Sequence, residues 1–359
     1  MYAVGVEDEV MLLDPGTFEL AHRAPEVLSM LRGDPRFKLE LPASQLEIVT
    51  SPTTTVAGAA AALLDARRAL VEAANQEVAF AAAGAHPFSA GVGALNHGTR
   101  YDPIIRKYGC VAERQLVCAL QIHISVGGSE RALAVYNAAR SYLPYLAALA
   151  ASAPFYEGID TGLASVRPKL SALLPRQGVP PSIDGWERYS ETLSWGATSG
   201  AFPDPGTWWW ELRLHPGFGT LEFRVPDAQS SVGDAVAIAA VTQALVAWLG
   251  AQYDAGERLR ADPSWKIEEN RWSACRDGVD GEMADLRTGR QRLTRTCLVD
   301  LLDALEPSAR ALAAEAELDR ARRLAEAGSA IPQRRVARQG GAGAVARWLS
   351  ERFLEEWRG

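Results

Sequence analysis

The stretch YAVGVEDEVMLL, residues 2–13, carries three acidic residues inside an apolar run that is typical of a β-strand. Side chains alternate between the two faces of a strand, so Glu7 and Glu9 share one face and Asp8 points to the other. We therefore expect Glu7 and Glu9 to serve a common purpose. We expect replacement of Asp8 to matter much less than replacement of either neighbour.

Polar residues recur on one face of two further strand-like segments. In FKLELPASQLEIVTSP, Pro42 interrupts the alternation and allows Glu40 and Glu47 to share a face. In CALQIHISVGG, alternation places Gln121 and His123 on one face and the isoleucines on the other. Together with the first stretch, these segments place acids or their polar equivalents on three strands.

The segment WWWELRLHPGFGTLEFRVPD has the alternation and the central glycines of a β-hairpin. Its first strand aligns Trp209, Glu211 and Arg213 on one face. Its second strand aligns Glu222 and Arg224. Each strand of the hairpin therefore presents an acid and an arginine two residues apart.

The chemistry of these faces distinguishes two explanations. On a single strand, a polar face is most simply the side of an antiparallel sheet that faces water. Acids and arginines on four strands, with very few lysines, indicate instead an enclosed carboxylate cluster, which is tolerable only with protons or cations. Oxygen ligands select Mg²⁺ or Mn²⁺, and neighbouring arginines suit phosphate or carboxylate groups. The pattern therefore indicates phosphoryl chemistry on a nucleotide.

Two nucleotide-binding motifs are missing from the sequence. It contains no GxxxxGK[ST], and no GxGxxG follows a predicted strand. If ATP is used, metals bound to carboxylates must hold it in place of a phosphate-binding loop.

The composition limits the classes of partner. The net charge of −7 over 359 residues argues against unaided binding to nucleic acid or to an anionic membrane. Four cysteines without a CxxC motif, and an N-terminus that enters a strand pattern directly, predict a cytoplasmic protein. The apolar run at 235–250 contains Gln243 and is too short to span a bilayer, so we expect a buried helix.

Strand and helix patterns are segregated rather than strictly alternating, which favours an α+β fold with a largely antiparallel sheet. No linker divides the chain, so we expect a single catalytic domain over 1–359. The expected strands are 2–13, 37–51, 81–86, 114–126, 208–214 and 220–225. The expected helices are 25–32, 55–80, 129–152, 183–193, 232–255, 293–327 and 345–357. We expect loops at 88–110, at 154–181 with a short helix at 167–174, and at the glycine-rich stretch 334–343.

Taken in order, these motifs resemble the glutamate–cysteine ligase type 2 family, also called the carboxylate–amine ligases. The resemblance covers nearly the whole chain and rests on GVEDEVMLLDP, SQLEIVTSP, GAHPFS, SAPFYEGIDTGLASVRP, HPGFGTLEFRVPDAQ and ENRWSACRDGVDGEMAD. It implies a fold like that of glutamine synthetase and the guanido kinases, with the antiparallel sheet curved into a funnel and helices packed outside. It also implies that ATP phosphorylates a carboxylate, typically the γ-carboxylate of glutamate, and that an amine then displaces phosphate to give an amide.

The resemblance also implies roles for individual residues. The implied ligands of two or three Mg²⁺ ions are Glu7, Glu9, Glu40, Glu47, Gln121 and Glu222. The implied nucleotide-binding residues are Glu9, Gln121, His123 and Arg224. The implied catalytic residues, which contact phosphate or the substrate carboxylate, are Arg213, Arg224 and Arg167.

Three positions depart from the family pattern. Gln121 stands where many members have the first histidine of GLHVHV, Glu211 replaces the aspartate of WDIRPHP, and Pro226 replaces the cysteine of VCDAQ. These departures do not affect the acids that would bind metal, but they leave the identity of the substrate undetermined. His123 has an alternative reading as a strand histidine that is hydrogen-bonded in the core.

The expected partners are a small amino acid and an amine, without nucleic acid or membrane, and a homodimer is compatible with the long apolar helices. Two other functions remain open at this point. A phosphotransferase of the same fold would stop at a phosphorylated product, and a catalytically degenerate binding protein would keep the cavity without turnover. A ligase of a specialised biosynthetic pathway is a variant of the main hypothesis.

Overall fold

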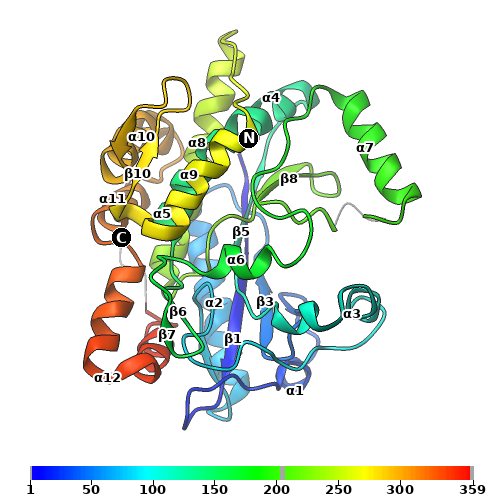
Figure 1. Ribbon diagram of the computed structural model, residues 1–359, viewed down its shortest axis with the longest axis vertical. Helices are drawn as coiled ribbons and strands as arrows, with labels where there is room; N and C mark the ends of the chain where they lie inside the picture. The colour runs from blue at the N-terminus through cyan, green and yellow to red at the C-terminus, as the bar shows by residue number, and fades with distance from the viewer. Residues whose placement is uncertain (1, 203–206, 356–359) are drawn as a thin grey trace.

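A seven-stranded antiparallel sheet forms the centre of the computed structural model, which describes residues 2–202 and 207–355 (Figure 1). The strand order is β2-β3-β1-β5-β9-β8, and β4 pairs with β1. The strands are β1 (Val4–Leu13), β2 (Phe37–Leu39), β3 (Gln45–Val49), β4 (Ala79–Ala81), β5 (Leu120–Ser125), β8 (Leu212–His215) and β9 (Thr220–Phe223). The predicted α+β class with an antiparallel sheet is confirmed.

The two faces of the sheet differ in polarity, because alternation along β1 puts valines on one side and glutamates on the other. The apolar face packs against α2 (Val56–Ala74) and α8 (Val232–Asp254). Both helices begin with a hydroxyl cap: the Thr55 side chain accepts a hydrogen bond from the Gly58 amide, and Ser231 accepts one from Asp234. The opposite, polar face is therefore left for a site.

Helix α8 is, within the described residues, the single helix long and apolar enough to cross a membrane. It is apolar on all sides, and 94% of its most apolar window is buried inside the protein. A helix that is hydrophobic all round is expected in the core of a large domain. The prediction of a buried helix is confirmed, and its bounds agree with the expected 232–255 to within one residue.

The remaining elements surround this centre. The other helices are α1 (Ala24–Met30), α3 (Asp102–Tyr108), α4 (Ser129–Ala139), α5 (Leu143–Ala150), α6 (Arg167–Ser171), α7 (Trp186–Thr198), α9 (Ser264–Asp277), α10 (Thr294–Ala311), α11 (Glu315–Ala327) and α12 (Ala330–Glu351). Two small hairpins are formed by β6 (Phe155–Tyr156) with β7 (Ile159–Asp160) and by β10 (Glu282–Ala284) with β11 (Gln291–Leu293). In Figure 1, α6 lies in front of the sheet and α7 extends away from it at the upper right.

Several predicted elements were wrong in detail. The segment 37–51 is not one extended run: β2 and β3 pair antiparallel, so the chain reverses between Leu39 and Gln45. Helix α3 lies within the predicted loop 88–110, and α9 was not predicted. The predicted strand at 208–214 begins only at Leu212.

The C-terminal segment also differs from the prediction. Most of the stretch 334–343 is helical, but a kink at Gly341, with φ of 72°, divides α12 into two helical parts, and the second part corresponds to the predicted last helix. Glycine adopts this left-handed conformation without the penalty that a side chain would bring. The last helix ends at Glu351, before the predicted end at residue 357, which itself lies outside the described residues.

Candidate active site

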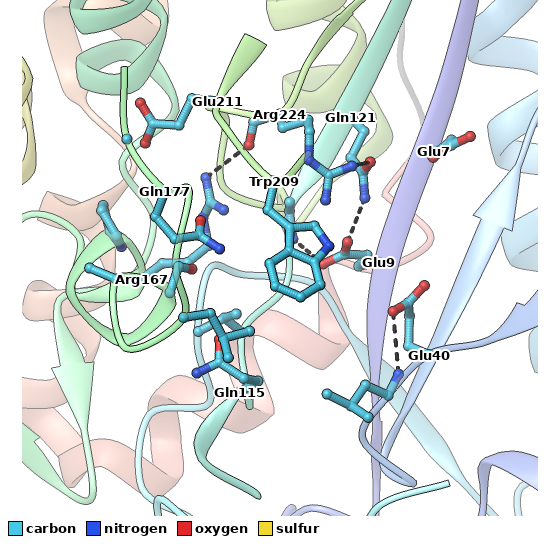
Figure 2. Close-up of a pocket in the computed structure, with 18 of the residues that line it drawn as sticks. Glu7, Glu9, Glu40, Gln115, Gln121, Arg167, Gln177, Trp209, Glu211 and Arg224 are labelled. Atoms are coloured by element: carbon cyan, nitrogen blue, oxygen red, sulfur yellow. Dashed lines mark hydrogen bonds between the residues drawn. The ribbon is translucent and has the colours of Figure 1, made fainter. Parts of the chain in front are cut away.

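A cavity of about 500 Å³ opens on the polar face of the sheet (Figure 2). One wall is formed by strand residues, and Figure 2 shows Glu7 and Glu9 on it, with Glu40 nearby. The opposite wall comes from the segment around α6 and from α9, and Figure 2 shows Arg167 there. The cavity brings together every residue that the sequence proposed for the site except His123 and Glu222, which lie beneath its surface on the same face.

The strand register explains why these side chains meet. Glu9 lies opposite Glu47 on β3, and Glu7 lies opposite Gln121 on β5. One register position further, Glu222 of β9 lies between His123 of β5 and Arg213 of β8. Because paired residues on neighbouring strands point to the same face, the polar side chains form continuous rows across the sheet.

Glu222 is fully buried and is held by two arginines. Arg213 Nε donates to one carboxylate oxygen at 2.5 Å, and Arg224 Nη1 donates to the other at 2.6 Å. Burial alone would raise the pKa of Glu222, but the positive charges of Arg224 and Arg213 lower it below its usual value. The carboxylate therefore stays ionised and fixes both guanidinium groups at the cavity wall.

Glu7, His123 and Glu222 form a candidate metal cluster, in which one donor atom from each lies within 4.8 Å of the others. His123 Nε2 is 3.4 Å from Glu7 and 3.9 Å from Glu222, and among the described residues this buried nitrogen has no hydrogen-bond partner. His123 Nδ1 contacts the Thr220 hydroxyl at 3.0 Å, which orients the ring. An imidazole that is oriented through one nitrogen and presents the other to two carboxylates fits a divalent cation.

The sequence had assigned His123 to the nucleotide and not to the metal. Its alternative reading, a strand histidine that is hydrogen-bonded in the core, holds for Nδ1, which bonds to Thr220, whereas Nε2 faces the two carboxylates.

A second group of acids, Glu9, Glu40 and Glu47, lies beside the first. Burial, and then the charge of Glu40, raise the pKa of Glu9 to about 7. Burial and the charges of Glu40 and Glu7 raise the pKa of Glu47 well above its usual value, and burial raises that of Glu40. Three enclosed carboxyl groups that resist simultaneous ionisation are the donor set that a hard cation would neutralise.

Gln121 connects the acids to an arginine. Its amide nitrogen donates to Glu9 at 2.6 Å, and its amide oxygen accepts a hydrogen bond from Arg224 (Figure 2). An amide can make both contacts at once because it carries a donor and an acceptor. The replacement of the family histidine therefore leaves a connected network.

Arg167 lines the cavity but is also part of its frame. Its Nε donates to Asp227 at 2.7 Å, and its Nη2 donates to the Val225 carbonyl at 2.5 Å. These bonds tie α6 to the chain that follows β9. Contact between Arg167 and a substrate remains a prediction.

One ion pair in the opposite wall was not predicted from the sequence. Arg271 of α9 binds both oxygens of Glu211, at distances of 2.7 to 2.9 Å, and both side chains are buried. Strand alternation could place Glu211 in the site but could not reveal a helix 60 residues later in the chain. The motif ENRWSACRD, which contains Arg271, was the only signal.

The raised pKa of Glu9 predicts that Mg²⁺ binding releases protons. Below about pH 7 the metal-free Glu9 is protonated, so Mg²⁺ must displace a proton and its apparent affinity falls as the pH is lowered. Calorimetric titration of Mg²⁺ in buffers of different ionisation enthalpy measures this release directly. The Glu9→Gln variant should release fewer protons, whereas the exposed Glu282→Gln variant should behave as wild type. Equal affinity at about pH 6 and pH 8 would contradict this assignment.

In the metal-free protein, the raised pKa of Glu9 also makes the stability of the fold depend on pH. Glu9 has a higher pKa in the folded state than the usual glutamate value of 4.5, so the folded state retains a proton that the unfolded state loses. Its contribution to stability is present at low pH and is lost as the pH rises from about 4.5 to about 7.

Comparison with known proteins identifies a family and a fold for the chain. The family model of glutamate–cysteine ligase family 2 matches residues 3–351. A protein of Rubrobacter xylanophilus, provisionally named glutamate–cysteine ligase 2-3, is 36% identical over 98% of this chain and 96% of its own length. A glutamate–cysteine ligase from Francisella tularensis, solved in complex with AMP, has a TM-score of 0.75 at 12% identity, with 99% of this chain and 89% of that chain covered. A bifunctional glutathione synthetase from Pasteurella multocida has a TM-score of 0.70 at 15% identity, with 98% and 52% covered.

The two solved structures establish a shared fold, and the family match establishes the class of enzyme. The protein is an ATP-dependent ligase. The chain belongs to the glutamate–cysteine ligase family 2.

Proposed function

We propose that this protein joins a carboxylate to an amine at the expense of ATP and Mg²⁺, with the γ-carboxylate of glutamate as acyl donor. The observation that carries the proposal is Glu222, which is held between Arg213 and Arg224 beside Glu7 and His123. This arrangement places two fixed positive charges next to a set of oxygen and nitrogen donors. Such a site suits a nucleotide whose phosphates are neutralised by both metal ions and guanidinium groups.

The proposal includes the finer features of the family. The chain acts as one catalytic domain in the cytoplasm, and the sheet forms the wall of a funnel-shaped site. A single large core that contains both Val4 and Phe353 supports the single domain. Mg²⁺ would be held by Glu7, His123 and Glu222 and by the second group of acids, and it would supply charge neutralisation to the phosphates.

The residues of the chain then have separate tasks in the reaction. An oxygen of the donor carboxylate attacks the γ-phosphorus of ATP, ADP leaves, and the amine displaces phosphate from the acyl carbon. Arg213 and Arg224 are fixed by Glu222, so they can stabilise negative charge on the transferred group without reorganising. Glu211 cannot supply a free charge, because Arg271 already neutralises it. The Glu211–Arg271 pair would limit the shape of the substrate.

Release of ADP in the presence of glutamate and single amines tests the proposal. We expect one or more amines, among amino acids, polyamines and aminoacylated carriers, to stimulate ADP release, and mass spectrometry to detect the amide. ADP formation with a phosphorylated product and without amide would replace the ligase by a phosphotransferase. If no amine raises ADP release above that with glutamate alone, the proposal is wrong.

A further inference from the structure

The turn between β8 and β9 carries an exposed aromatic ring at the rim of the cavity. Phe218 is 65% exposed although it is a large apolar residue. One face of its ring stacks on His215, with ring centroids 4.3 Å apart and an interplanar angle of 10°. Both residues line the cavity. A single exposed apolar side chain is common on a protein surface, but a ring that lines a cavity offers an apolar face to a ligand.

The turn holds this ring pair in place. The Phe218 amide donates to His215 Nδ1 at 3.2 Å, and the Gly219 amide donates to the His215 carbonyl at 2.9 Å. Gly219 has φ of 64°, a conformation that glycine adopts readily. The stacked pair is therefore a fixed feature of the hairpin, ready before a ligand arrives.

The stacked pair adjoins the candidate metal cluster. The ring of His123 makes edge contacts with His215 and with Phe218, at centroid distances of 5.5 and 5.6 Å. His123 Nε2, on the same ring, faces Glu7 and Glu222. A ligand with phosphates at the cluster would therefore have its next flat group within reach of Phe218.

A second aromatic ring in the cavity, that of Trp209, is less accessible for stacking with a ligand. Trp209 lies in the cavity (Figure 2), but the Arg176 guanidinium sits 5.2 Å from its ring centroid and Tyr108 meets it edge to face at 5.7 Å. Each ring has two such neighbours, but Phe218 is 65% exposed whereas Trp209 is partly buried. This difference favours Phe218 as the surface for an additional ring.

We infer that Phe218, supported by His215, stacks with the purine base of the nucleotide whose phosphates bind at Glu7, His123 and Glu222. The inference rests on the proposed function and adds the position of the base, at the mouth of the cavity. The reacting γ-phosphate then points inward, toward Arg213 and Arg224. Stacking recognises the π-face of a base, which inorganic polyphosphate lacks.

Calorimetric binding of Mg²⁺-ATP and of Mg²⁺-tripolyphosphate separates the base from the phosphates. Loss of one base-stacking contact predicts that Phe218→Ala binds Mg²⁺-ATP roughly 5- to 30-fold more weakly but binds Mg²⁺-tripolyphosphate as wild type does. Phe218→Trp should retain wild-type affinity for Mg²⁺-ATP. The matched control is Trp195→Ala, since Trp195 is 63% exposed on α7 and lies outside the cavity lining.

Two results would overturn the inference. One is unchanged affinity of Phe218→Ala for Mg²⁺-ATP. The other is an equal loss for both ligands, which would mean that Phe218 supports the phosphate site instead of the base. Failure of the proposed function is distinct from both, because the wild-type protein would then make no amide whatever its affinity for ATP.

Discussion

Glu222→Gln is expected to reduce amide formation at least about 100-fold while the protein remains folded. The substitution preserves the shape of the side chain but removes the charge that both arginines share. It also replaces one of the two carboxylates in the Glu7–His123–Glu222 cluster with a neutral amide. The measurement is the rate of ADP-coupled amide formation, with circular dichroism and thermal unfolding to verify the fold.

The matched control for this variant is a glutamate that pairs with arginine far from the cavity. Glu191 binds Arg188 on the exposed surface of α7, so Glu191→Gln should retain wild-type activity. Activity of Glu222→Gln within about threefold of wild type would contradict the assignment of Glu222 to the site.

Asp8→Ala is expected to lower the free energy of unfolding by about 3–5 kcal/mol. Asp8 and Arg67 of α2 form an ion pair in which both side chains are 0% exposed. Arg67 also donates to the carbonyls of Gln229 and Phe353, both at 3.0 Å, so its charge is at the centre of a buried network. Removal of Asp8 leaves this charge without its counterion. Urea-induced unfolding measures the loss.

The expectation from sequence that Asp8 would matter little was therefore incomplete. Alternation correctly placed it on the face opposite Glu7 and Glu9, but that face is the core, where a charge must be paired. Asp65→Ala is the matched control, because its pair with Arg36 is exposed and should contribute less than about 1 kcal/mol. A loss of less than about 1 kcal/mol for Asp8→Ala would contradict the structural role.

Period-two alternation was sufficient to predict the acid-lined face, since it depends only on the geometry of each strand. It placed Glu7, Glu9, Glu47 and Glu222 correctly, and the register then brought them together. It could not predict the reversal between β2 and β3, where Pro42 only marked an interruption.

Contacts between distant segments were the other limit of sequence reasoning. The pairs Arg67–Asp8, Arg167–Asp227 and Arg271–Glu211 join residues about 60 positions apart. Each joins a helix to a strand or to its flanking segment, and no local periodicity encodes such a pairing. The sequence did not suggest the proposed metal role of His123 for a related reason, since that role depends on which neighbours face Nε2.

Transfer of ¹⁸O from the donor carboxylate to phosphate tests the central claim most directly. Glutamate labelled with ¹⁸O in its γ-carboxylate is incubated with the protein, Mg²⁺-ATP and an amine that stimulates ADP release. Activation as an acyl phosphate predicts one ¹⁸O atom in inorganic phosphate for each amide formed, because the carboxylate oxygen that attacks phosphorus leaves with it. Amide formation with unlabelled phosphate would contradict the account.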